Sequence, residues 1–182
     1  MEQQEFLMIR DAWLGEFRKQ KAYIDGAAAQ LNDEQFRARP APNLNSVAMI
    51  IKHLAGNLRS RWTDWLTTDG EKPDRDRDRE FVDEGESRGA LMECYEQGWK
   101  LLFAGVEGLN ASDLSRTVRI RSEPHSVPLA VNRQLAHVAY HAGQVMLIAR
   151  SLAGDAGWKW ATVPPGKTGE FNRARNQRHG PA

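Results

Sequence analysis

Two histidines stand four residues apart in a segment with a helical pattern, and this spacing is suited to holding a metal ion. His137 and His141 belong to the stretch QLAHVAYHAGQV. A four-residue step returns to nearly the same face of an α-helix, about 40° around and about 6 Å along the axis, so both imidazoles can reach one ion. Helical His-x3-His is a common metal half-site for this reason. The alternative reading is two imidazoles that are simply hydrogen-bonded to their neighbours.

A third histidine strengthens the metal reading. His53 lies in IIKHLAGNLRSRW, beside the apolar stripe of a second helical segment, and the other two histidines flank their own stripe. Such positions suit a site at the rim or mouth of a helical bundle. Three neutral imidazoles with an open position resemble a catalytic zinc site, and nickel, iron or manganese would fit if oxygen ligands complete the shell. We therefore predict a divalent transition metal on His53, His137 and His141.

Four segments must position these histidines. Apolar residues recur at three- and four-residue steps in each, which is typical of amphipathic helices. The predicted helices span about 6–26, 46–67, 88–109 and 129–152. They indicate an all-α four-helix bundle with a long, charged crossover loop and a short hairpin or irregular excursion before the last helix. We assign residues 1–160 to the bundle and 161–182 to a C-terminal tail that packs in part and is flexible beyond.

The composition excludes several classes of function. The net charge is +1, and acidic and basic residues alternate in the crossover loop, so neither nucleic acid nor an anionic membrane surface is an expected partner. No apolar stretch is long enough to cross a bilayer. The one cysteine, Cys94, cannot form an internal disulfide, which favours a reducing compartment. We expect a cytoplasmic protein that acts on a small molecule.

The sequence resembles the DinB/YfiT-like superfamily of metalloenzymes, and in particular a DinB-like subfamily of about this length. The resemblance rests on HLAGNLRSRWTDWL, on QLAHVAYHAGQVMLIARSL and on the tail WKWATVPPGKTGEFN. The family pattern has one histidine in the second helix and His-x3-His in the last helix of a four-helix bundle. It maps onto His53, His137 and His141 without a departure at those positions.

The resemblance implies more than the residues do by themselves. It implies a bound divalent metal such as nickel or zinc and allows a homodimer. It also suggests enzymes that use low-molecular-weight thiols. A three-histidine metal site could activate water for hydrolysis or a thiol for S-transfer, and the sequence does not choose between them. The alternative is a non-catalytic bundle that binds a metal or a small ligand.

Further polar residues are candidates for support of the metal ligands or contact with substrate. Asn57 follows His53 by about one turn, Gln144 follows His141, and Tyr140 precedes it; each could instead serve packing or the helix surface. Arg59 and Arg61 could bind an anionic group, but pairing with Asp78, Glu80 or Asp83 in the crossover loop is the favoured interpretation.

Overall fold

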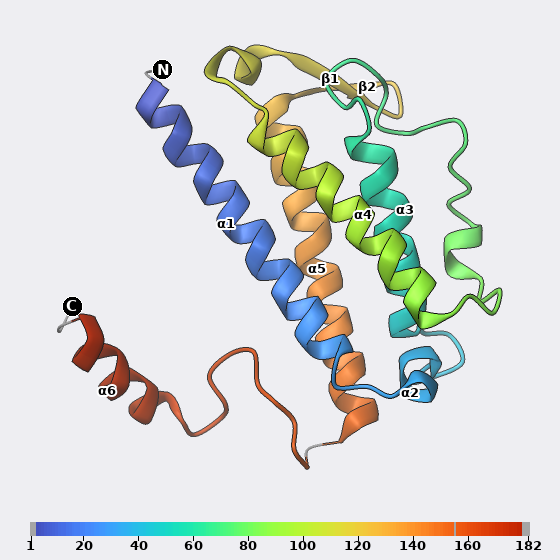
Figure 1. Ribbon diagram of the computed structural model, residues 1–182, viewed down its shortest axis with the longest axis vertical. Coiled ribbons are helices and arrows are strands. Elements are labelled where there is room, and N and C mark those ends of the chain that lie inside the picture. The colour runs from blue at the N-terminus through green and yellow to red at the C-terminus, as the bar shows by residue number, and fades with distance from the viewer. Residues whose placement is uncertain (1–2, 155, 180–182) are drawn as a thin grey trace.

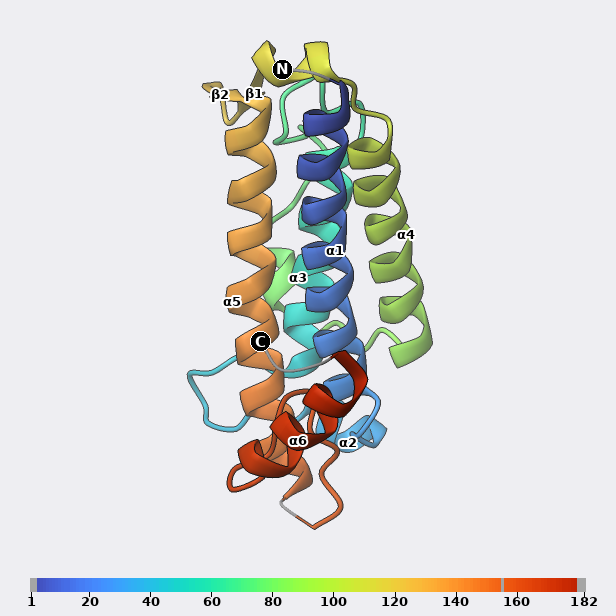
Figure 2. The same cartoon turned by 90° about the vertical axis from the view of Figure 1, so that its left-hand side faces the viewer.

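The computed structural model of the chain describes residues 3–154 and 156–179, and its main body is a bundle of four long helices. The four helices run alongside one another in both ribbon views (Figure 1, Figure 2). They are α1 (Gln3–Ala28), α3 (Val47–Trp62), α4 (Arg88–Glu107) and α5 (Val127–Ala153). The predicted all-α class is therefore confirmed.

Three of the four bundle helices begin in the same way. Ser46, Ser87 and Ser126 precede α3, α4 and α5, and each side-chain oxygen accepts a hydrogen bond from the backbone N–H three residues further along. A serine in this position satisfies one of the four N–H groups that an α-helix leaves unpaired at its start, which stabilises the helix by about 1 kcal/mol. These caps fix where the helices carrying the histidines begin.

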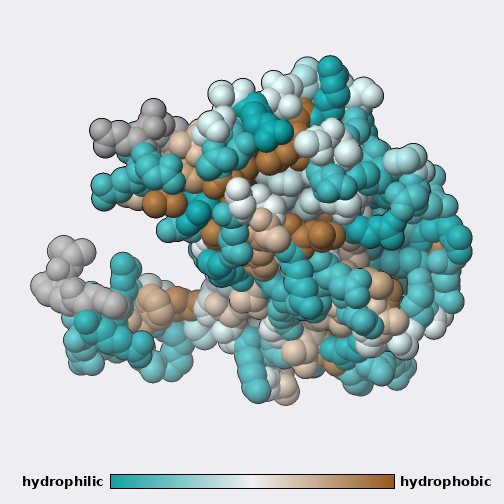
Figure 3. All heavy atoms as spheres, turned by 45° about the horizontal axis from the view of Figure 1, so that its top comes forward, coloured by the Kyte–Doolittle hydropathy of each residue, from teal (hydrophilic) through white to brown (hydrophobic). Residues whose placement is uncertain are grey.

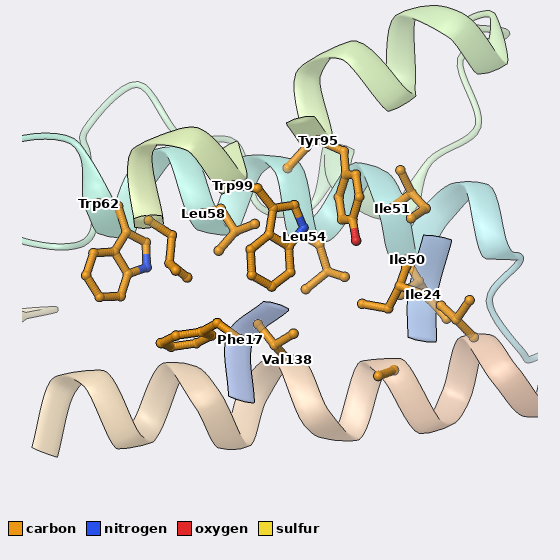
Figure 4. Close-up of a cluster of buried hydrophobic side chains, with 14 of the residues drawn as sticks. Phe17, Ile24, Ile50, Ile51, Leu54, Leu58, Trp62, Tyr95, Trp99 and Val138 are labelled. Atoms are coloured by element: carbon orange, nitrogen blue, oxygen red, sulfur yellow. The ribbon is translucent and has the colours of Figure 1, made fainter. Parts of the chain in front are cut away.

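Aromatic side chains dominate the core between the helices. Phe17 of α1 meets Trp62 of α3 and Trp99 of α4 edge to face, with ring centroids 6.4 and 6.3 Å apart. Val138 of α5 points into the same cluster (Figure 4). All four side chains are buried, and the apolar periodicity predicts this for Phe17, Trp62 and Val138. The core therefore holds α3 and α5 in the bundle.

The second predicted helix ends earlier than the sequence pattern suggests. The expected end was near Thr67, but α3 ends at Trp62, and Asp64 adopts a positive φ of 47° that no α-helix accommodates. Trp65 is nevertheless buried, because a turn returns it to the core. Its apolar position therefore extended the periodic pattern past the true end of the helix.

Two further helices lie outside the bundle. The short α2 (Asp33–Arg37) begins with a capping box formed by Asn32 and Gln35. The predicted tail contains α6 (Thr168–His179), a helix that the sequence pattern did not indicate, and it stands apart from the four-helix body in Figure 1. The division of the chain at residue 160 stays a prediction.

The crossover loop (residues 63–87) and a hairpin are joined to each other at one end of the bundle. The hairpin consists of antiparallel strands β1 (Thr117–Ile120) and β2 (Glu123–Ser126), as expected before the last bundle helix. The Asp69 carboxylate accepts hydrogen bonds from the backbone N–H groups of Arg121 and Ser122 at the hairpin turn, at 2.8 and 2.6 Å. The loop and the hairpin thus form one wall of the molecule.

Figure 3 turns this end of the bundle toward the viewer. Hydrophilic residues predominate on the face shown, with small apolar patches between them. Within residues 3–154 and 156–179, no helix combines the length and the apolar character needed to cross a membrane.

Candidate metal centre

The three predicted histidines lie together between α3 and α5. Their candidate ligand atoms all fall within 4.8 Å of one another, and the ring centroids of His137 and His141 are 4.7 Å apart. The Nε2 atoms of His53 and His137 approach to 3.2 Å. His53 and His141 are buried and His137 is half-buried. All three lie midway along their helices, and Glu80 and Phe81 of the crossover loop contact His53.

The proton of His53 is positioned by a buried carboxylate. Nδ1 of His53 lies 2.8 Å from Oε2 of Glu80, which belongs to the short 3-10 helix η1 (Arg79–Phe81). Burial raises the pKa of Glu80, but hydrogen bonds from His53 and from Arg75 outweigh that effect and lower it overall. Since an ionised carboxylate can only accept, Nδ1 of His53 carries the proton. In the neutral ring the lone pair of His53 is then on Nε2, which faces the other two histidines.

Gln144 positions the proton of His141 in the same way. Nδ1 of His141 lies 2.8 Å from Oε1 of Gln144, an amide oxygen that accepts the Nδ1 proton. Nε2 of His141 is then the free lone pair. Hydrogen bonds of this kind fix the tautomer and orientation of metal-ligating histidines in known sites. Gln144 is one of the sequence candidates for such support, and its amide oxygen contacts His141.

The nitrogen lone pairs of the cluster remain available at neutral pH. Burial, together with the nearby imidazoles of His141 and His53, lowers the pKa of His137 to about 3. Burial and the proximity of His53 lower the pKa of His141 to about 4. Both rings are therefore neutral over the physiological range, as metal ligation requires.

Two buried nitrogen atoms of the cluster lack hydrogen-bond partners, which is consistent with a bound cation. Among the described residues, the buried His141 Nε2 and His137 Nδ1 have no hydrogen-bond partner. Buried polar atoms without a partner are costly and call for an explanation such as an ion. Three neutral nitrogen donors that converge are the ligand set preferred by zinc and similar transition metals. The residues present thus fit a divalent metal, which would be held by His53, His137 and His141.

Glu80 reaches His53 because α3 has a glycine where the carboxylate passes. A Cβ atom added to Gly56 would lie 2.2 Å from Oε1 of Glu80. Arg75 holds the same carboxylate through two hydrogen bonds of 2.8 and 2.9 Å, and Phe81 stacks on the His53 ring with centroids 4.8 Å apart. The crossover loop is therefore part of the site and not merely a solvated surface segment.

A cleft of about 200 Å³ adjoins the cluster, and His53, His137 and Tyr140 belong to its lining. Tyr140 is half exposed, and its ring lies 4.1 Å from that of His141. Burial raises the pKa of Tyr140, so its hydroxyl keeps its proton at neutral pH. The open side of the three-histidine cluster can thus receive a molecule from the cleft.

The other sequence candidates divide between packing and the site. Asn57 is buried, lines the cleft and accepts a hydrogen bond from Gln134 at 3.1 Å, which joins α3 to α5. Arg59 pairs with Asp74 of the crossover loop. Arg61 pairs with Glu71 of the same loop at 3.3 Å and also lines the cleft. The favoured pairing with the loop is confirmed for both arginines, but through acidic residues other than the expected Asp78, Glu80 and Asp83.

Comparison with known proteins gives a family but no function. A family model described as "Protein of unknown function (DUF1572)" matches residues 4–167, which include the whole bundle and all three histidines. None of the curated proteins compared with the chain matches it.

Proposed function

Because the chain belongs to the DUF1572 family, whose description assigns no activity, we propose its function from the three-histidine cluster. We propose that the protein binds one divalent transition metal through His53, His137 and His141 and uses it in a reaction on a small molecule. We also propose that it is related to the DinB/YfiT-like superfamily, which its histidine pattern resembles.

One observation carries this proposal. The Nδ1 atoms of His53 and His141 are engaged by Glu80 and Gln144, so their two Nε2 atoms face a common centre beside His137. The buried Nε2 of His141 has no hydrogen-bond partner among the described residues, and a metal ion would supply one. The carboxylate–histidine contact is also the arrangement that holds ligands in known metal sites.

The reactions that we favour are S-transfer from a low-molecular-weight thiol and hydrolysis. When bound, nickel, zinc, iron or manganese would supply Lewis acidity and lower the pKa of water or a thiol. The chain's own residues keep His137 and His141 neutral, and Glu80 and Gln144 orient His53 and His141. We further propose that the Tyr140 hydroxyl donates a hydrogen bond to a substrate, because Tyr140 lines the cleft.

A non-catalytic role in binding a metal or a small ligand is the second candidate. It is favoured by the absence of a free acid–base carboxylate: in the described part of the chain, no Asp or Glu lines the cleft. Glu80 is held by Arg75 and His53 and is not available to move protons. In that case metal and ligand would bind without turnover.

Turnover separates the two candidates. The full chain, loaded in turn with nickel, zinc, iron and manganese, would be mixed with glutathione or cysteine and 1-chloro-2,4-dinitrobenzene. In S-transfer the thiol sulfur bonds to the ring carbon, chloride leaves and the thiol proton passes to the buffer. A parallel assay would use an ester, p-nitrophenyl acetate. We expect metal-dependent turnover that His141→Ala abolishes. Equal rates in both proteins, or none, would exclude these two reactions for these substrates and favour the binding role.

A further inference from the structure

The cleft beside the histidines has an unusually cationic lining. Six arginines from α3, the crossover loop, the hairpin and α5 contribute to it within the described residues, whereas no aspartate or glutamate there does. They are Arg61, Arg75, Arg77, Arg119, Arg121 and Arg133. Four separate segments of the chain therefore direct like charges to one cleft, although the chain as a whole is nearly neutral.

One carboxylate outside the lining is shared by three of these arginines. Glu71 lies 3.3 Å from Arg61, 3.3 Å from Arg75 and 3.2 Å from Arg121. Arg75 is additionally neutralised by Glu80. A single carboxylate cannot balance the charges of both Arg61 and Arg121, so the cleft keeps a positive potential.

The other three arginines form no ion pair with any described residue. The guanidinium of Arg77 lies 5.3 Å from the centre of the Phe81 ring, and Arg119 donates to the backbone oxygen of Ser122 at 2.8 Å. Arg133 donates to Nε2 of His125 at 3.0 Å. Each of these contacts orients a guanidinium without neutralising its charge, and all three arginines are exposed to a molecule entering from solvent.

Burial and the neighbouring positive charges both act on Arg61. Its Nη1 is buried and has no hydrogen-bond partner among the described residues. Burial, with the neighbouring charges of Arg75, Arg121 and Arg133 acting in the same direction against Glu71, lowers the pKa of Arg61 to about 10. An anion in the cleft would relieve this repulsion.

Apolar side chains form another part of the lining. Trp65, Val118 and Ile120 are buried residues that contribute to the cleft, and Trp62 adjoins them. Clefts with an apolar wall and a few oriented polar groups are typical of sites for small organic molecules. This wall distinguishes an organic anion from an inorganic ion.

We propose that the cleft binds a small organic anion, in which a carboxylate or phosphate group contacts the arginines and an apolar body packs on the Trp65 side. The cleft adjoins His53 and His137, so the anion would be the substrate or co-substrate of the metal site. That last assignment rests on the proposed function, whereas the binding of the anion does not.

Isothermal titration calorimetry on the full chain tests this proposal. The probes are phenylacetate, phenyl phosphate, inorganic phosphate and the neutral phenylacetamide, each at an ionic strength of about 0.15 M so that distant charges are screened. We expect at least one aromatic anion to bind at least about tenfold more tightly than phenylacetamide, and phenyl phosphate to bind more tightly than inorganic phosphate. Binding of one aromatic anion but not the other supports the proposal and identifies the group that is recognised.

The variants locate the binding. Arg119→Gln combined with Arg133→Gln is expected to weaken anion binding at least about tenfold, and Arg77→Gln provides a second test if the double variant does not fold. Arg79→Gln is the matched control, since Arg79 is exposed in the same loop but does not line the cleft, and its effect should stay within about twofold. No anion binding, equal binding of phenylacetamide, or equal binding by the cleft variants would overturn the proposal.

The same titrations on chelator-treated protein and on His137→Ala keep the two proposals separate. Anion binding that survives while the parent takes up no metal supports the cleft and contradicts only the metal proposal. Metal uptake without anion binding contradicts only the cleft proposal.

Discussion

At the scale of single residues, the candidate site depends on which nitrogen of each imidazole carries a proton. Glu80 and Gln144 place the protons of His53 and His141 on Nδ1. Both Nε2 atoms therefore point toward the three-histidine cluster and not toward the solvent. The buried ion pair of Glu80 with Arg75 keeps the carboxylate ionised and in position. Residues that do not touch the metal would therefore set its affinity.

We predict that Glu80→Gln lowers the affinity for zinc about 10- to 100-fold, because the charge that orients His53 and strengthens its lone pair is lost. A competition titration against a chromophoric zinc chelator measures the effect. Asp78→Asn is the control, since Asp78 is an exposed acidic residue two positions before Glu80 in the same loop, and its side chain forms no cap hydrogen bond. Equal zinc affinities for both variants and the parent would contradict the role assigned to Glu80.

The histidines could be predicted from the sequence, but Glu80 could not. Residue type and helical spacing are enough to identify His-x3-His and His53 as candidate metal ligands. Glu80 belongs to DRDRDREF, where nearly every residue is charged and local pattern gives no reason to prefer one. Its role follows from a contact between residues 27 positions apart. The available signals were a glycine in mid-helix, Gly56, and the aromatic Phe81 next to Glu80.

At the scale of elements, the decisive contact is the one between α3 and the crossover loop. Gly56 leaves room for Glu80, and a Cβ there would overlap with its carboxylate. Lys52 holds the same loop from the neighbouring turn of α3, donating to Glu84 at 2.8 Å and to the backbone oxygen of Val82 at 3.0 Å. The close approach of the loop to α3 is thus built into the helix sequence.

We predict that Gly56→Ala lowers the free energy of unfolding by about 1–3 kcal/mol, since the buried Glu80 must shift, although alanine favours a helix by about 1 kcal/mol. Gly15→Ala is the control. Gly15 lies in α1 and a Cβ there meets nothing within 4 Å, so this variant should be neutral or up to about 1 kcal/mol more stable. Urea unfolding measures both, and a stabilised Gly56→Ala would show that the contact is loose.

Helices with a strong apolar stripe and a serine cap were predictable, and their ends were less so. The stripe of the second segment continued to Trp65, which is buried in a turn, so the pattern could not show that Asp64 breaks the helix. The polar α6 was missed because its residues carry no apolar period. Periodicity reports burial, and it finds a helix only where the helix packs on a core.

At the scale of the whole molecule, the four-helix core is a rigid support for two chemically different regions. α3 and α5 bring the three imidazoles together, and the crossover loop and hairpin complete a cationic cleft beside them. The aromatic core around Phe17 and Trp99 fixes the positions of both helices. The proposed function depends on one claim, that these imidazoles hold a metal.

Elemental analysis tests that claim most directly. The full chain, purified without a chelator or a histidine tag, would be compared with His137→Ala and with His125→Gln, a control at a buried histidine of the hairpin outside the cluster. We predict about one equivalent of a divalent transition metal in the parent and in the control, and its loss in His137→Ala. A parent that contains no metal and gains no thermal stability from added nickel, zinc or manganese would contradict the account, as would a His137→Ala protein that keeps the full equivalent.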